Sequence, residues 1–167
     1  MIRVAPDERQ SVRARRRLAR AGVAVLATLQ AEIGIWGVLA PHSFYASYPG
    51  DGHHWVSQMG PYDEHLVRDF AAMELGFAVL LVCAAVWFER RLVLVAGAAF
   101  MAATLPHFAY HLTTTPMLST ADNLASLGGF AIELALIANA IAIAWTRSAV
   151  PSEPAMRVPA SIPPQLD

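Results

Sequence analysis

The sequence has no lysine and a single cysteine, Cys83. One cysteine cannot form an intrachain disulfide, and its place inside an apolar stretch is typical of a small buried residue. The chain also has no Cys-x-x-Cys, no Gly-x-Ser-x-Gly and no Gly-rich phosphate loop. Thiol–disulfide exchange, elbow-serine hydrolysis and nucleotide binding therefore lack the residues that they need.

Charge of either sign is scarce as well. Only 15% of the 167 residues are charged and 56% are hydrophobic, the mean hydropathy is +0.42, and the formal net charge is −1. Such a chain is too apolar for a soluble domain of this size. Its charge balance gives no reason to expect a nucleic acid partner.

The apolar residues fall into four stretches, at about 18–40, 64–88, 92–112 and 122–146. Each has about the 20 residues that a helix needs to cross a hydrocarbon layer. Helices satisfy their own backbone hydrogen bonds in lipid, and the alternating segments of a membrane barrel are not visible. We therefore expect an all-α protein, a four-helix transmembrane bundle spanning 18–146. Without a broken-helix repeat, a self-sufficient secondary transporter is not expected.

Arginine and histidine lie on opposite sides of these stretches. Eleven of the twelve arginines lie before or at the start of the first stretch, follow the fourth, or separate the second from the third, and only Arg68 does not. All six histidines lie in or near the other two connections, 41–63 and 113–121. The positive-inside rule then predicts a multi-pass protein of the plasma membrane with both termini cytoplasmic. We expect 1–17 to be a basic cytoplasmic segment and 147–167 a disordered, Pro-rich cytoplasmic tail.

An alternative interpretation makes residues 1 to about 30 a cleaved signal peptide, with a basic start and an apolar core at Ala21–Leu29. The apolar run continues past Glu32 to Ala40, however, which favours a full span.

The connection 41–62 is rich in aromatic residues of the kind that collect at a membrane surface. Pro49-Gly50-Asp51-Gly52 and Gly60-Pro61 are turn signals within it. Two interpretations are open: an interfacial re-entrant loop anchored by aromatics, or a lid that brings His53 and His54 over the helix ends. We expect this extracytoplasmic loop to be ordered against the helix ends.

Each stretch carries ionisable residues, although these are costly in a membrane and usually face a bundle interior. Counting along each helix at about 1.5 Å per residue puts His65, Asp69, His107 and His111 within about 10 Å of the outer surface. The same count puts Glu32, Glu74 and Glu133 about 12–18 Å deep. The polar residues thus gather in the outer half.

Three pairs have the i,i+4 spacing that places two side chains on one helix face. His65 with Asp69 and His107 with His111 would each present two metal-donor groups. Imidazole and carboxylate donors together suit Zn, Fe, Mn or Cu, so we expect these four residues to converge into the bundle and share one ion. Glu64 or Glu74 would lie nearby as proton acceptor. The third pair, Glu64 with Arg68, fits an intrahelical salt bridge.

Each of these features has a simpler explanation beside it. His107 and His111 are also typical of interfacial residues that bind water or headgroups, and a haem or proton-relay role is a further possibility. Ser119-Thr120-Ala121-Asp122 matches a capping pattern, so Asp122 is better explained as part of a helix start than as a ligand. Asp63 is expected to cap the helix that follows it.

The segments Pro41–Tyr45, Trp55-Val56 and Gly60–Asp69 resemble a pattern in small four-span membrane proteins of actinobacteria, whose layout is similar to the DoxX-like group. The likeness covers roughly 18–146. It implies a bacterial membrane protein with this topology and implies no activity.

Two function classes follow. The first is a non-catalytic integral membrane subunit, in contact with lipid, whose polar residues fix helix register and contacts in a homo- or hetero-oligomer. The second is a membrane enzyme or redox protein with a metal centre of His65, Asp69, His107 and His111, acting on a lipid-like or quinone-like substrate. The second requires the two pairs to converge, whereas the first is compatible with separate pairs.

Overall fold

The computed structural model describes residues 6–114 and 118–146, and all of its regular elements are helices. These are α1 (Pro6–Leu39), α2 (Pro41–Ser47), α3 (Glu64–Trp87), α4 (Arg90–Thr113) and α5 (Thr120–Thr146). Four of them are long and apolar enough to cross a membrane. The predicted all-α fold with four apolar spans is confirmed, and the chain is a multi-pass membrane protein by this criterion. The predicted tail 147–167 lies outside the described residues.

Helix α1 begins earlier than its apolar residues require. It continues through the arginine-rich segment because arginine and alanine are good helix formers. One turn of this segment is also held by the end of α3. The guanidinium of Arg20 donates hydrogen bonds to the carbonyls of Ala85 and Val86, at 2.9 and 2.8 Å. The arginine-rich segment therefore contributes to helix packing, in addition to indicating the orientation in the membrane.

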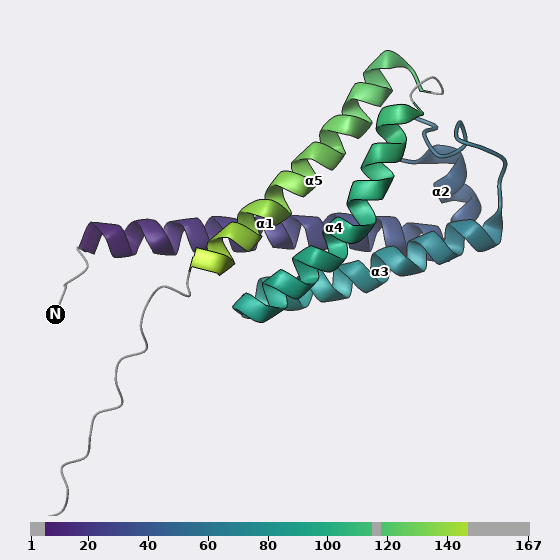
Figure 1. The fold of residues 1–167 in the computed structure, drawn as a ribbon. Helices are drawn as coiled ribbons and strands as arrows, with labels where there is room; N and C mark the ends of the chain where they lie inside the picture. The colour runs from purple at the N-terminus through teal and green to yellow at the C-terminus, as the bar shows by residue number, and fades with distance from the viewer. Residues whose placement is uncertain (1–5, 115–117, 147–167) are drawn as a thin grey trace, which may run out of the picture.

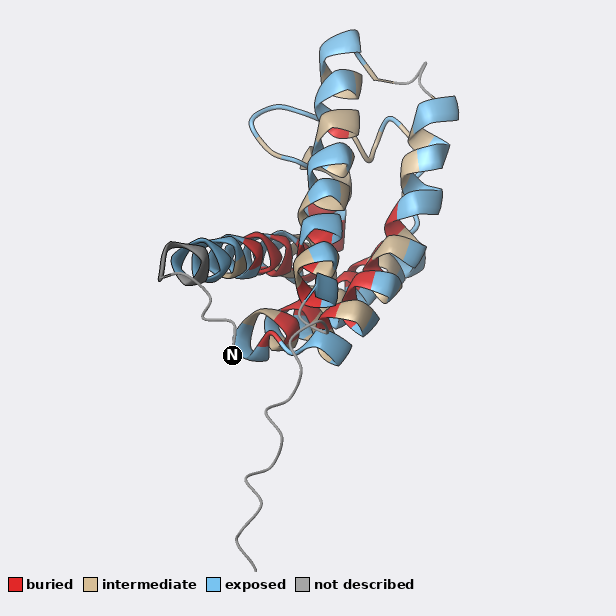
Figure 2. Ribbon diagram, turned by 60° about the vertical axis from the view of Figure 1, so that its left-hand side comes forward, coloured by how far each residue is buried: buried red, intermediate tan, exposed pale blue. Residues whose placement is uncertain are grey.

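The helices form two antiparallel pairs that cross each other (Figure 1). Helices α1 and α3 lie side by side, and α4 and α5 run diagonally across them. Buried residues gather where the pairs cross, while the far ends of α4 and α5 are largely exposed (Figure 2). Every long helix supplies this core; its largest fully buried side chains are Val23, Leu26, Leu81, Phe88, Val93, Phe100 and Ile137.

Large apolar side chains are also exposed on every span, among them Val25, Val79, Val95 and Ile132. In water, such a surface would drive association or aggregation. In a bilayer it is the surface that contacts lipid tails.

The close approach of α1 and α3 depends on two glycines. A Cβ at Gly34 would lie 2.8 Å from the backbone nitrogen of Leu75 and 2.9 Å from the carbonyl oxygen of Ala71. A Cβ at Gly37 would lie 2.5 Å from the Cβ of Ala71. Small residues at these positions let the two backbones pack closely, as is common between membrane helices.

The connection between α1 and α3 contains the short helix α2, which the sequence did not predict. Phe44 of α2 is buried and packs edge-on against Trp36 of α1, with 5.7 Å between ring centroids. The predicted turn follows, where Gly50, Asp51 and Gly52 all have positive φ values of 112°, 52° and 82°. Glycine adopts this backbone conformation without a steric cost, which explains its presence on either side of Asp51.

Candidate functional site

The two pairs expected to share a metal ion lie on different surfaces. His65 and Asp69 contact each other, with Nδ1 and Oδ2 3.2 Å apart, but their side chains are 86% and 65% exposed. The expectation that they face the interior is wrong. Val67 and Ala71 define the buried face of α3, and His65 and Asp69 are each two positions from a buried residue. Two positions are about 200° around a helix axis, so the pair points away from the bundle.

Glu64, a candidate proton acceptor, is bound to Arg68. Its Oε1 accepts a hydrogen bond from Nε of Arg68 at 2.8 Å, as the i,i+4 spacing predicted. The same arginine donates to the carbonyl oxygen of Val38, near the end of α1. Arg68 thus joins the start of α3 to the last turn of α1, and Glu64 holds the arginine in place for this contact.

His107 and His111 face two neighbouring helices. Their Nε2 atoms are 3.1 Å apart. The ring of Phe130, from α5, lies against both imidazoles, with centroid distances of 4.8 and 5.1 Å. Phe70 of α3 contacts His107 edge-on at 6.1 Å. Both imidazoles therefore pack against aromatic rings of neighbouring helices, but they are not enclosed, since His107 is exposed and His111 half-buried.

The described parts of the chain, 6–114 and 118–146, contain no group of three or more His, Cys, Asp or Glu residues placed to hold one metal ion. The predicted convergence of His65, Asp69, His107 and His111 is thus not found. Spacing correctly put each pair on one face of its helix. It could not tell which face of α3 is buried.

Glu74, the other candidate proton acceptor, is 8% exposed on the inner face of α3. It lies close enough to Glu133 of α5 for the two carboxyl groups to interact electrostatically. The side chain of Gln30 in α1, which is 4% exposed, lies near Glu133. These three residues link α1, α3 and α5 across the interior.

Tyr48, in the connection after α2, extends toward this group. Burial, and then the negative charges of Glu133, Glu32 and Glu74, raise the pKa of its phenol to about 12. Its ring also packs on Trp55 at 6.2 Å. Burial and nearby negative charges both disfavour the phenolate, and charges act over several ångströms in a medium of low dielectric constant. The phenol therefore stays protonated at neutral pH.

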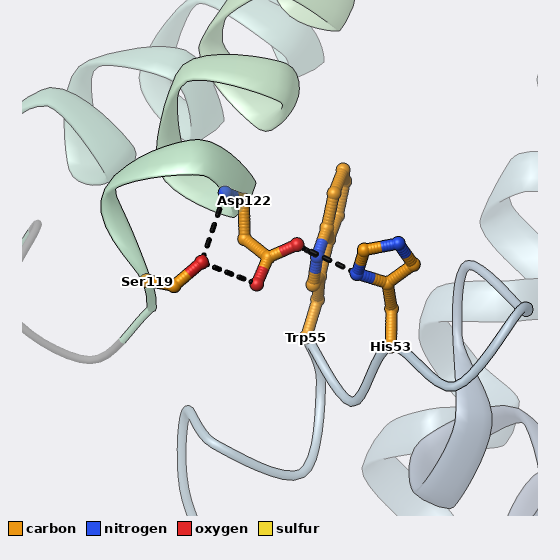
Figure 3. Close-up of polar contacts among 4 residues, drawn as sticks. All are labelled: His53, Trp55, Ser119 and Asp122. Carbon is orange, nitrogen blue, oxygen red and sulfur yellow. Dashed lines mark hydrogen bonds and ion pairs between the residues drawn. The ribbon is translucent and has the colours of Figure 1, made fainter.

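Asp122 connects the start of α5 to the 41–62 connection (Figure 3). Its Oδ1 lies 2.6 Å from Nδ1 of His53 and accepts a hydrogen bond from Nε1 of Trp55 at 2.9 Å. The predicted helix cap is confirmed: Ser119 Oγ accepts from the backbone nitrogen of Asp122 at 3.2 Å and donates to its Oδ2 at 2.7 Å. Asp122 therefore also holds the 41–62 connection against α5, a role that the capping pattern did not predict.

The predicted cap at the start of α3 is confirmed too. The Asp63 carboxylate accepts a hydrogen bond from the backbone nitrogen of Leu66 at 3.0 Å. By contrast, no spacing in the sequence predicts that Trp55 and His53 contact Asp122, or that the glutamates act electrostatically on Tyr48. Those contacts join segments far apart in the chain, and no local spacing encodes them.

No protein-family model matches this chain, and neither a curated protein nor a solved structure is significantly similar to it.

Proposed function

We propose that the chain is a non-catalytic integral membrane subunit whose polar side chains hold its helices and its 41–62 connection in register. The observation that carries this proposal is that polar residues at the helix ends form separate local contacts and do not share one centre. His65 pairs with Asp69, Glu64 with Arg68, and His53 and Trp55 with Asp122. An enzyme of the kind considered above needs these groups to share one centre.

The grooves on the surface support the same proposal. Two shallow apolar grooves lie along α1 and α3, one lined by Ala24, Val25, Thr28 and Leu29 and the other extending to Val82 and Val86. Neither groove contains a candidate catalytic residue. They are surfaces for lipid tails or for a neighbouring helix.

Orientation is proposed from the arginines. With both termini cytoplasmic in the plasma membrane, the 41–62 connection forms an ordered cap on the extracytoplasmic side. Its contacts with Asp122 and the buried side chain of Phe44 support that role. Partners are proposed to bind through transmembrane helices: open space at Gly128 and Gly129 of α5 would let another helix approach closely.

A double-mutant cycle tests whether the polar pairs are independent. We expect His65→Ala and His107→Ala to change the free energy of unfolding additively, with a coupling below about 0.5 kcal/mol. Unfolding of the single and double variants would be followed in one detergent, with and without added Zn²⁺. Coupling well above this limit that appears with Zn²⁺ would contradict the proposal and favour a shared metal centre of an enzyme or redox protein.

A further inference from the structure

We propose that His107 and His111 alone form a two-histidine site for a divalent transition-metal ion near the C-terminal end of α4. The pair is one helical turn apart, and its two Nε2 atoms are 3.1 Å apart. Two nitrogen donors at about 2.0–2.1 Å from one tetrahedral ion are about 3.3 Å apart. The spacing of the two Nε2 atoms is therefore within a few tenths of an ångström of the spacing that one bound ion needs, and binding requires the rings to turn until both lone pairs point at the ion.

The surroundings keep the rings in this arrangement. Phe130 of α5 contacts both imidazoles, and Phe70 of α3 contacts that of His107. Their positions are thus set by packing between three helices as well as by the backbone of α4. A pre-organised pair of donors loses less conformational freedom on binding than two free side chains do.

The pair is also open to the surface, since His107 is exposed and His111 half-buried. Helix α4 ends at Thr113, so His111 lies about 3 Å and His107 about 9 Å from its end. Within residues 6–114 and 118–146, no third His, Cys, Asp or Glu completes the site. The remaining coordination positions are therefore left to water or to an external ligand, as in an open metal site.

Metal uptake by this pair is chemically balanced without a further reactant. In the hydrogen-bonded pair of neutral imidazoles, one Nε2 carries the shared proton and the other accepts it. When an ion binds both Nε2 atoms, that proton moves to Nδ1 of its own ring, so no net proton is released. Neutral imidazole suits Cu²⁺, Zn²⁺ and Ni²⁺, and among these Cu²⁺ binds most tightly to a nitrogen site.

A titration with Cu²⁺ tests the site. The full chain would be purified in detergent without a histidine tag, and affinity measured by calorimetry. Because the two donors act as a chelate, His107→Ala and His111→Ala should each weaken binding by about 100-fold. Electron paramagnetic resonance of the wild-type complex should show two equivalent nitrogen ligands. His111→Gln, two residues from the helix end, serves as a variant with little risk of misfolding.

The matched controls remove histidines that lie next to another possible metal donor but outside the proposed site. His65→Ala breaks the His65–Asp69 pair, and a His53→Ala/His54→Ala double variant removes the adjacent histidines of the 41–62 connection. Both should bind Cu²⁺ as the wild type does. Unchanged affinity in His107→Ala and His111→Gln, or loss of binding only in the control variants, would overturn the proposal. Neither result bears on whether the chain is a non-catalytic subunit, which is tested by the coupling between His65 and His107.

Discussion

The pKa of Tyr48 depends on residues that are distant from it in the sequence. It lies in a connection rich in turns and aromatic residues, and its sequence neighbours suggest an ordinary interfacial tyrosine. Its phenol is nevertheless influenced by carboxyl groups of α1, α3 and α5. A spacing rule could find the helical pairs because both partners lie within one turn. It could not find Tyr48, whose partners are brought to it only by tertiary packing.

The raised pKa of Tyr48 gives a testable pH dependence. Because burial and the nearby carboxyls raise this pKa to about 12, the folded chain keeps a proton that an unfolded chain loses near pH 10. The unfolded state then binds fewer protons, so the free energy of unfolding should fall as the pH rises from about 10 toward 12. Tyrosinate absorbance should include a phenol that ionises with a pKa of about 12.

Tyr48→Phe removes that phenol and keeps the ring. The variant should lose both the late-ionising absorbance and this part of the alkaline decrease in stability. If wild type and variant give superimposable titrations up to about pH 12, the phenol is not shielded as the structure indicates.

At the scale of elements, the sequence predicted the four long helices because length and hydropathy are properties of each segment by itself. The predicted helix boundaries mostly differ from the observed ones by two residues or fewer, apart from the early start of α1. Which face of each helix is buried was not predictable in the same way. An apolar helix in lipid is hydrophobic on all sides, so periodicity does not single out the inner face that contains Val67 and Ala71. The wrong orientation of His65 and Asp69 has this cause.

Gly34 provides the sharpest test of how α1 packs on α3. Gly34→Ala would place a Cβ within 2.8–2.9 Å of backbone atoms of α3. These atoms cannot move without separating the helices, so we expect a loss of about 1–3 kcal/mol in unfolding free energy. The measurement is the midpoint of thermal or denaturant unfolding in a fixed detergent.

Gly76→Ala is the matched control, since a Cβ at Gly76 meets nothing within 4 Å. Gly76 lies inside α3, where alanine is the better helix former, so this variant should be neutral or more stable by up to about 1 kcal/mol. Equal destabilisation by both substitutions would mean that helix contact at Gly34 is not close.

On the scale of the whole molecule, the membrane topology can be predicted from the placement of charged residues, whereas the crossing of the helix pairs cannot. Arginine placement predicts which ends of the helices share a side of the membrane, and that needs no knowledge of packing. Where the α1–α3 pair crosses the α4–α5 pair, Gly22 of α1 packs against α5, and a Cβ at Gly22 would lie 3.1 Å from Cδ2 of Leu136. Such contacts depend on both partners, so a single sequence does not specify them segment by segment.

The proposed topology makes a prediction for the intact chain in cells. Reporter domains fused after Asp51, Arg90, Pro116 and Pro154 should read outside, inside, outside and inside. The reason is that arginines border the chain ends and the α3–α4 turn, while the other two connections have none apart from Arg68 within α3. Arg68→Gln is the control: its guanidinium is held by Glu64 and by the carbonyl of Val38, so losing it should leave all four readings unchanged. An inside signal at Asp51 would reverse the orientation and remove the 41–62 connection from the extracytoplasmic side.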